Sequence, residues 1–303
     1  MRKEEWITEE EGIRIDKLVS DQLDLSRSRV QMLVDEGKIL VNDKPVKNSY
    51  KAEAGDRITV EIPDAESVDL LPEDIPLDIL YEDSDIIVIN KPKGMIVHPA
   101  PGIYTGTLVN ALLYHCQDLS GINGEIRPGI VHRIDKDTTG CLVACKNDMA
   151  HEAIARQLET KTCSRKYKAI VTGNITHNDL YINAPIGRDP RDRQKMTVTD
   201  KHSREAITKV HVLERFRNHT YIECELETGR THQIRVHMKY IGHPVVGDLK
   251  YGKKCKEIET NGQVLHAYEL ELIHPRTGEK MVFNAPLPAY FEELLEIYRH
   301  EQY

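Results

Sequence analysis

The chain has 303 residues and a mass of 34.7 kDa, a length that predicts about two domains. Hydrophobic residues make up 40% of it and charged residues 30%, which is typical of a globular protein and excludes collagen-like and low-complexity classes. The sequence has no apolar run near the roughly 18 residues that a membrane helix needs, and its first residues reach no apolar stretch of signal-peptide length. We therefore expect a cytoplasmic protein that makes no membrane contact.

Cysteine and histidine spacing gives no indication of a metal site. The six cysteines lie at positions 116, 141, 145, 163, 224 and 255, and no pair has the two-residue spacing of zinc clips or redox motifs. His232, His237 and His243 do not follow a metal-ligand spacing either. We expect reduced, mostly buried thiols and no bound metal.

The net charge of −8 conceals a segregation of charge along the chain. Residues 61–85 include ten acidic residues and no Lys or Arg, whereas residues 160–217 include thirteen basic and six acidic residues. Such asymmetry suggests a surface with one face able to contact phosphates. A solvated lysine-rich surface would give the same counts, so charge alone does not decide whether the partner is a polyanion.

The first predicted elements form a small module over residues 13–62. Residues 13–19 have the apolar spacing of an amphipathic helix, and a second helix follows with Ser26 or Ser28 as its N-cap and ends at Gly37. Short strands are predicted at residues 39–41 and 56–62. The sequence therefore predicts a compact α+β unit at the N-terminus.

A linker and a larger domain follow. Residues 63–85 are acidic and include Pro72 and Pro76, which predicts an extended linker. Residues 86–303 form one domain, with strands predicted at 85–90, 139–145, 167–171, 206–216 and 220–227 and helices at 107–114, 149–158, 231–241 and 288–299. Because strands outnumber crossover helices, we predict an α+β fold with a mixed, largely antiparallel sheet.

The densest group of polar residues is Gly129-Ile-Val-His-Arg-Ile-Asp-Lys-Asp-Thr-Thr-Gly140. An apolar lead, a cluster of ionisable side chains and a glycine exit are typical of a loop held by rigid elements, where catalytic groups tend to lie. Asp135 is the candidate nucleophile or base. A turn-forming or capping role is the alternative for this residue.

A second polar stretch is Glu227-Thr-Gly-Arg-Thr-His-Gln-Ile-Arg-Val-His237. Thr231 is expected to cap a helix whose Ile234 and Met238 face the core while Arg235 lies on another face. An arginine there could pair bidentately with a carboxylate of the first stretch. A charge-rich surface helix is the alternative interpretation.

Together these stretches resemble the RluA/RluD family of RNA pseudouridine synthases. Five segments carry the resemblance, in order over residues 80–300: Asn90-Lys-Pro-Lys-Gly-Met with Val97-His-Pro, Gly106-Thr-Leu-Val-Asn-Ala-Leu, His132-Arg-Ile-Asp-Lys-Asp-Thr-Thr-Gly, Lys166-Tyr-Lys-Ala, and Gly229-Arg-Thr-His-Gln-Ile-Arg-Val-His. Residues 13–62 also resemble the alpha-L RNA-binding module of a small-subunit ribosomal protein. The resemblance implies a catalytic domain of the pseudouridine synthase type behind an RNA-binding module.

The resemblance also assigns roles to individual residues. It implies that Asp135 is the essential aspartate, Tyr167 the active-site tyrosine and Arg235 the basic residue paired with Asp135. Arg133 resembles the arginine that fills the RNA helix when a uridine is flipped out. We further expect two groups of contacts: His132, Arg230 and Lys91 with the substrate, and Arg27, Arg29, Lys44 and Lys47 with RNA in the N-terminal module.

The implied reaction breaks the bond from carbon-1′ of ribose to nitrogen-1 of uracil, rotates the base and joins carbon-5 instead. No atoms leave, so no cofactor or metal is needed. One ionised carboxylate can form a covalent adduct at carbon-1′ or take the 2′ proton to give a glycal, and the sequence does not separate these routes. The expected partner is RNA, with large-subunit ribosomal RNA preferred and transfer RNA as an alternative, and the expected state is a monomer.

Two other functions are weighed against this one. Asp135 and Asp137 could be the paired carboxylates of a glycoside hydrolase, which lie about 5 to 9.5 Å apart. Sugar sites favour aromatic platforms, however, and the chain has one Trp, at position 6. A non-catalytic RNA-binding protein is the other alternative, but it leaves more than 200 residues beyond the module without a role.

Overall fold

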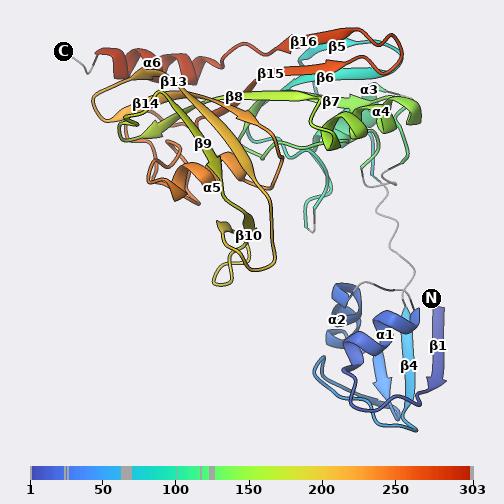
Figure 1. Cartoon of the computed structure of the whole chain (residues 1–303). Coiled ribbons are helices and arrows are strands. Elements are labelled where there is room, and N and C mark those ends of the chain that lie inside the picture. Colours follow the sequence, from blue (N-terminus) through green and yellow to red (C-terminus); the bar gives the residue numbers. More distant parts are fainter. Residues whose placement is uncertain are drawn as a thin grey trace. The chain divides into compact units, whose positions relative to one another are not determined.

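A computed structural model of the chain describes residues 2–23, 25, 27–62, 70–100, 102–116, 118–122 and 127–300. The chain divides into an N-terminal unit, Met1–Val68, and a C-terminal unit, Asp69–Tyr303, and each has its own hydrophobic core (Figure 1). Within these described ranges, none of the helices combines the length and apolar character needed to cross a bilayer.

The N-terminal unit is a four-stranded antiparallel sheet with two helices. It contains β1 (Arg2–Ile7), α1 (Ile15–Leu23), α2 (Arg27–Asp35), β2 (Ile39–Val41), β3 (Lys44–Pro45) and β4 (Arg57–Ile62), with strand order β1-β4-β2-β3. Ile15, Leu33 and Ile58 have no solvent exposure and centre its core. The predicted helices and strands are confirmed, but the unit begins earlier than residue 13 because β1 pairs with β4 along its whole length. The predicted N-cap side chains of Ser26 and Ser28 lie outside the described residues.

The C-terminal unit is built on one long mixed sheet with strand order β5-β6-β7-β15-β8-β14-β13-β9 and β16 paired to β15. Strands β7 and β15 run parallel, and the other neighbours run antiparallel. The strands are β5 (Ile79–Glu82), β6 (Ile86–Lys91), β7 (Thr139–Cys145), β8 (Ser164–Thr172), β9 (Asp179–Asn183), β13 (Ile207–Arg215), β14 (His219–Leu226), β15 (Leu265–Ile273) and β16 (Lys280–Asn284); β10 (Ile186–Arg188), β11 (Met196–Val198) and β12 (Ser203–Arg204) form a separate small sheet. The predicted mixed, largely antiparallel α+β fold is confirmed.

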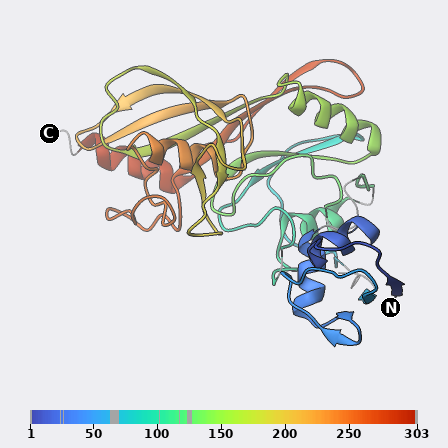
Figure 2. The ribbon, with the colours of Figure 1, turned by 60° about the horizontal axis from the view of Figure 1, so that its bottom comes forward.

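Helices cover both faces of this sheet. Helices α3 (Leu108–His115) and α5 (Gln233–Tyr240) pack into the hydrophobic core on one face of the sheet. Helices α4 (Asp148–Glu159) and α6 (Ala289–His300) pack against the other face. Figures 1 and 2 show α6 lying along the sheet near the C-terminus. The predicted cap of α5 is wrong: its N-cap is His232, with a φ of 58° and no side-chain cap bond. Gln233 Oε1 instead accepts the Arg230 N–H, ahead of the helix, at 3.0 Å.

The predicted linker is too long. β5 lies inside the predicted linker. It is the edge strand of the sheet and pairs antiparallel with β6. The carboxylate of Glu73 accepts the Gly106 N–H at 3.0 Å, and Asn110 Nδ2 donates to the Leu71 carbonyl at 2.9 Å. Residues 70–85 are therefore part of the C-terminal unit, and residues 63–69 lie outside the described residues.

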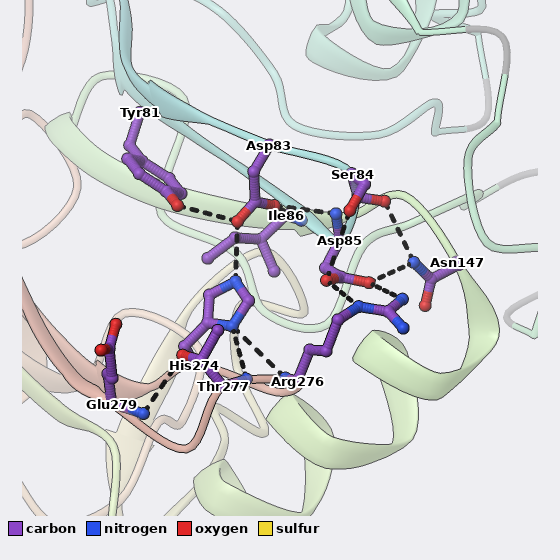
Figure 3. A network of polar contacts seen from close by, with 10 residues as sticks. All are labelled: Tyr81, Asp83, Ser84, Asp85, Ile86, Asn147, His274, Arg276, Thr277 and Glu279. Carbon is purple, nitrogen blue, oxygen red and sulfur yellow. Dashed lines mark hydrogen bonds and ion pairs between the residues drawn. The ribbon is translucent and has the colours of Figure 1, made fainter.

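A polar network joins the β5–β6 turn to the β15–β16 turn (Figure 3). The Arg276 guanidinium donates to both oxygens of Asp85, at 2.7 and 2.5 Å, and Asn147 donates to Asp85 at 2.8 Å. His274 Nε2 donates to Asp83 at 2.7 Å while its Nδ1 accepts a backbone N–H. The network thus links segments about 190 residues apart in sequence.

Candidate active site

Residues 131–138 form a loop that leads directly into β7. The Thr138 N–H donates to the Asp135 carbonyl at 3.1 Å, and the Gly94 N–H donates to the Lys136 carbonyl at 3.0 Å. Gly140, with a φ of 109°, closes the loop at a point where a Cβ would lie 2.1 Å from the Ala267 carbonyl oxygen. The strands on either side therefore fix the backbone around Asp135.

Lys91 holds this loop by its side chain. Its fully buried ammonium donates to the carbonyls of Pro92 and Met95 at 2.8 Å and of Lys136 at 3.0 Å. Burial lowers the pKa of Lys91 to about 7, but three acceptors require three hydrogens, which only the ammonium form carries. Lys91 does not line the cavity described below. Its contacts therefore indicate that it positions the loop, and not that it contacts the substrate as expected.

Asp135 is held by an arginine that also holds a second carboxylate. Arg235 Nη1 donates to Asp135 at 2.8 Å, while its Nε and Nη2 donate to the two oxygens of Asp248 at 2.6 and 2.9 Å. Asp248 has no solvent exposure, whereas Asp135 is partly exposed. Burial alone would lower the pKa of Arg235, and the two carboxylates raise it instead. Asp135 is thus oriented by a single charge-assisted bond, whereas the bidentate pair considered for an arginine of this helix forms with Asp248.

A cavity of about 860 Å³ opens beside this trio and is lined by Asp135, Tyr167 and Arg235 together. The Tyr167 side chain projects from β8, on the same face of the sheet as α3 and α5, and is only 6% exposed. Burial raises the pKa of Tyr167 to about 12, so its hydroxyl is protonated at neutral pH. The three residues predicted to be catalytic therefore meet in one place.

The cavity is strongly basic although the whole chain is acidic. Five arginines besides Arg235 line it: Arg127, Arg133, Arg165, Arg204 and Arg230. The acidic lining residues are Asp135 and Glu159. Arg165 and Arg204 belong to the basic segment 160–217 that the charge count singled out. An anionic polymer is the natural ligand of such a cavity.

Three of the predicted substrate contacts, Arg133, Arg230 and His132, line this cavity. Arg133 is exposed, with its Nη1 lying 3.2 Å from His98 Nε2. Arg230 also lines the cavity and donates through Nε to the Glu205 carbonyl at 2.8 Å. His132 forms part of the wall, where its Nε2 accepts the Val143 N–H at 3.1 Å. Burial lowers the pKa of His132 to about 3, so this imidazole is neutral.

Asp137 faces a second cavity, of about 1140 Å³, which Asp135 also lines. Its side chain lies against Gly262, where a Cβ would be 2.5 Å from the Asp137 Cβ and a φ of 118° already requires glycine. The two carboxylates share the second cavity, but Asp137 is absent from the first, where Asp135 meets Tyr167.

Among the residues that the structure describes, potential metal ligands come together in two places, and neither group lines the first cavity. In the group of Asp83, Asp85 and His274, the carboxylates already accept from Arg276 and from backbone N–H groups. In the group of Glu82, His115 and Cys116, Lys146 donates to Glu82 at 2.9 Å. In each group a basic side chain, Arg276 or Lys146, already pairs with a carboxylate.

Comparison with known proteins agrees with this geometry. Residues 85–240 match the family described as RNA pseudouridylate synthase, and residues 13–58 match the S4 domain. The chain is 58% identical over 289 residues to the "Uncharacterized RNA pseudouridine synthase YlyB" of Bacillus subtilis, which covers 95% of both chains. It is 45% identical over 302 residues to the "Ribosomal large subunit pseudouridine synthase D" of Neisseria meningitidis, covering 96% of this chain and 80% of the relative. The chain belongs to the RNA pseudouridine synthase family.

Solved structures of synthases share the fold. "Human RNA Pseudouridylate Synthase Domain Containing 4" aligns with a TM-score of 0.58 and 24% identity, covering 73% of this chain and 92% of that one. "Human RNA Pseudouridylate Synthase Domain Containing 1" aligns with a TM-score of 0.57 and 24% identity, covering 78% and 98%. Membership in the synthase family confirms an enzyme that isomerises uridine in RNA. The hydrolase and binding-only alternatives are therefore wrong.

The S4 match coincides with the predicted RNA-binding module of the synthase. Lys44 and Lys47 are exposed and line one hollow of about 570 Å³ together with Tyr50. Arg27 is exposed at the start of α2, and the side chain of Arg29 lies outside the described residues. Two of the four predicted RNA contacts therefore share a surface.

Sequence reasoning missed two residues of the synthase site. Asp248 follows a buried Val-Val-Gly segment and has no polar cluster around it in the sequence, so nothing marks it as a partner of Arg235. Arg165 lies two residues before Tyr167, within a run of basic residues that is typical of a surface. The alternation of a strand was the available signal for Arg165, because it places residues 165 and 167 on one face.

Proposed function

We propose that this chain converts uridine to pseudouridine in large-subunit ribosomal RNA, with Asp135 as the group that acts on the ribose. The observation that carries the proposal is the meeting of Asp135, Arg235 and Tyr167 in one basic cavity. Relatives named for the large ribosomal subunit are 42% to 45% identical to this chain over most of its length, which supports the substrate. Because those relatives are bacterial, we also propose that the enzyme works in the cytoplasm. The proposed oligomeric state is a monomer.

The reaction begins with extrusion of the target uridine. A stacked uridine hides its glycosidic bond, and flipping it out costs a few kcal/mol. Arg133 is exposed where both cavities meet, so its side chain is placed to fill the gap left in the RNA. Arg127, Arg204 and Arg230 supply positive charge to the same cavity and would bind the flanking phosphates.

The chemistry then needs an ionised carboxylate at carbon-1′. Arg235 fixes the direction of the Asp135 carboxylate through the 2.8 Å bond. From this position Asp135 either attacks carbon-1′ or takes the 2′ proton, and both steps release uracil from the ribose. The buried Tyr167 ring lies at the cavity wall, where it can stack on the detached base while carbon-5 turns toward carbon-1′.

The matched pair Asp135→Asn and Asp137→Asn tests the proposal. Each variant is incubated with an unmodified large-subunit ribosomal RNA transcript, and pseudouridine is mapped along it. Asp135→Asn should fold and bind but lose isomerisation by several orders of magnitude, whereas Asp137→Asn should remain active. Equal losses would contradict the role of Asp135. Pseudouridines that vanish from transfer RNA alone in cells lacking the gene would contradict the ribosomal substrate.

A further inference from the structure

Arg165 enters the catalytic cavity from β8, beside Tyr167. The two residues are separated by one position on the strand, so their side chains project from the same face. Both line the first cavity. Gly229 makes room for the Arg165 guanidinium, because a Cβ at position 229 would lie 2.6 Å from Nη1. The site is therefore shaped around this side chain.

The charge of Arg165 is uncompensated. In the part of the chain that the structure describes, its side chain makes no hydrogen bond or ion pair, and its buried Nε has no partner. Two other arginines of the wall already have acceptors, because Arg235 donates to two carboxylates and Arg230 donates to a backbone carbonyl. Among the described arginines, Arg165 is the one with a buried nitrogen that lacks a partner. A half-buried guanidinium that keeps free donors beside the catalytic residues is prepared for a ligand that is anionic or rich in acceptors.

The trio of Arg235, Asp135 and Asp248 cannot bind an anionic ligand in this way. Two carboxylates, Asp135 and Asp248, share the single positive charge of Arg235, so the trio carries a formal charge of −1. Yet when the bond between carbon-1′ and nitrogen-1 breaks, its electron pair leaves with uracil, whose negative charge spreads over nitrogen-1 and oxygen-2. This holds whether Asp135 attacks carbon-1′ or removes the 2′ proton. The leaving base needs a cation other than Arg235.

We propose that Arg165 is a catalytic residue that stabilises the detached uracil anion. The proposal rests on the proposed function, since it concerns the same reaction. The guanidinium donates to oxygen-2 or nitrogen-1 of the anion. Carbon-5 then bonds to carbon-1′ as the ester bond to Asp135 breaks or, on the glycal route, as Asp135 returns the proton to carbon-2′. The carbon-5 proton is then released and nitrogen-1 takes up a proton. The product is an isomer of the substrate, and no oxidant or co-reactant is needed. A fixed donor aimed at developing charge in a buried site is among the largest single contributions to catalysis.

The electrostatics of the wall agree with this placement. Burial raises the pKa of Tyr167 to about 12, and the positive charge of Arg165 opposes that rise. Burial also lowers the pKa of His132, and Arg165 lowers it further. The charge of Arg165 therefore reaches two other residues that line the first cavity, Tyr167 and His132.

Arg165→Met tests the role, with Lys166→Met as the matched control. Lys166 is the next residue on β8, points to the other face and pairs with Glu269 at 2.7 Å. The single-turnover rate at saturating RNA should fall about 10² to 10³-fold in Arg165→Met, the usual loss for one such donor. RNA affinity should stay near that of the wild type, and Lys166→Met should keep both rate and affinity.

A better leaving group separates this role from a structural one. The same variants are assayed on a transcript that carries 5-fluorouridine, because fluorine withdraws electron density and stabilises the base anion. Since carbon-5 then has no proton to release, the readout on this transcript is the single-turnover disappearance of 5-fluorouridine, which reports cleavage of the bond to nitrogen-1. The rate penalty of Arg165→Met should then shrink, and Arg165→Lys, which keeps the charge, should lose less on either transcript. Gly229→Ala, which displaces the guanidinium without removing it, should show the same dependence on the leaving group.

Three results would overturn the proposal. An equal penalty on both transcripts would indicate a structural role for Arg165. A loss confined to affinity, with a salt slope smaller by about 0.7 to 0.9, would indicate a phosphate contact instead. An unchanged rate would remove Arg165 from the reaction. A wild-type protein that converts no uridine in the ribosomal transcript would instead contradict the proposed function, which keeps the two failures distinct.

Discussion

Arg235 and Asp248 are joined by two parallel hydrogen bonds, of 2.6 and 2.9 Å, and the Asp248 side chain has no solvent exposure. A bidentate pair fixes the plane of the guanidinium as well as its position. The remaining nitrogen, Nη1, is thereby directed at Asp135. Asp248 is itself held by the N–H groups of Lys250 and Tyr251, at 2.9 and 3.1 Å. The direction of the Asp135 carboxylate thus depends on a buried residue that does not line the first cavity.

Asp248→Ala should destabilise the chain by about 3 to 5 kcal/mol, because it leaves a buried guanidinium with one partner instead of two. The free energy of unfolding, from denaturant titration followed by circular dichroism, measures the loss. Asp179→Ala is the control, since Asp179 pairs with His211 on the surface and such pairs contribute at most about 1 kcal/mol. Similar losses in both variants would contradict the importance of the buried pair.

Tyr167→Phe should keep the fold and RNA binding but slow isomerisation. The ring remains to fill the buried position and to stack on the base, while only the hydroxyl of this cavity-lining residue is removed. Single-turnover assays at saturating RNA measure the rate, and filter binding measures affinity. Tyr181→Phe is the matched control, because Tyr181 is 59% exposed on β9 and should be silent. Wild-type turnover in Tyr167→Phe would refute a role for the hydroxyl.

Elements with a local signal are the ones the sequence predicts well. Helix α3 begins at Thr107 as its apolar pattern indicates, because Thr107 and Asn110 form reciprocal capping bonds. The apolar run of β7 is buried at every position. β5 escaped prediction because acidic residues and prolines surround it, and its strand character comes from pairing with β6. Such pairing is a tertiary effect that no local pattern reports.

The same distinction holds for the site. Asp135, Tyr167 and Arg235 stand in dense motifs, so the resemblance could place them. Asp248 and the free guanidinium of Arg165 have meaning only through what surrounds them in space. Lys91 shows the converse, because a residue inside a matched motif turns out to support the loop from within the core.

The ion pair of Asp85 and Arg276 should make stability depend on pH at the acid end. Arg276 lowers the pKa of Asp85 from 3.8 to about 2. The folded state therefore binds fewer protons than the unfolded state in this window, so the contribution is complete above about pH 4 and is lost as the pH falls to about 2. Arg276→Met should lower the unfolding midpoint at pH 7, and the difference from wild type should narrow toward pH 3.

Lys280→Met is the control for that measurement. Lys280 pairs with Glu271 on β15 and β16, but the ammonium is 66% exposed, so its removal should change little at either pH. A difference between Arg276→Met and wild type that is as large at pH 3 as at pH 7 would show that the network of Figure 3 acts through packing and not through charge.

The N-terminal unit should supply affinity without taking part in the chemistry. Lys44 and Lys47 line one hollow and are exposed, as expected for groups that bind phosphates. Removal of one lysine–phosphate interaction should reduce the slope of log affinity against log salt by about 0.7 to 0.9. A chain that lacks residues 1–68 should thus need more RNA and show a flatter salt dependence, while its rate at saturating RNA stays near that of the full chain.

The double variant Lys44→Gln, Lys47→Gln should show a smaller effect of the same kind, because it removes two cations and keeps the rest of the unit. Lys38→Gln is the matched control, since the Lys38 ammonium already pairs with Glu36 at 2.7 Å in the same unit. Filter binding across a salt series gives the slope, and single-turnover assays give the rate. If the shortened chain kept full affinity and an unchanged slope, the unit would not bind RNA; if its rate at saturation fell away, the unit would take part in assembling the active site.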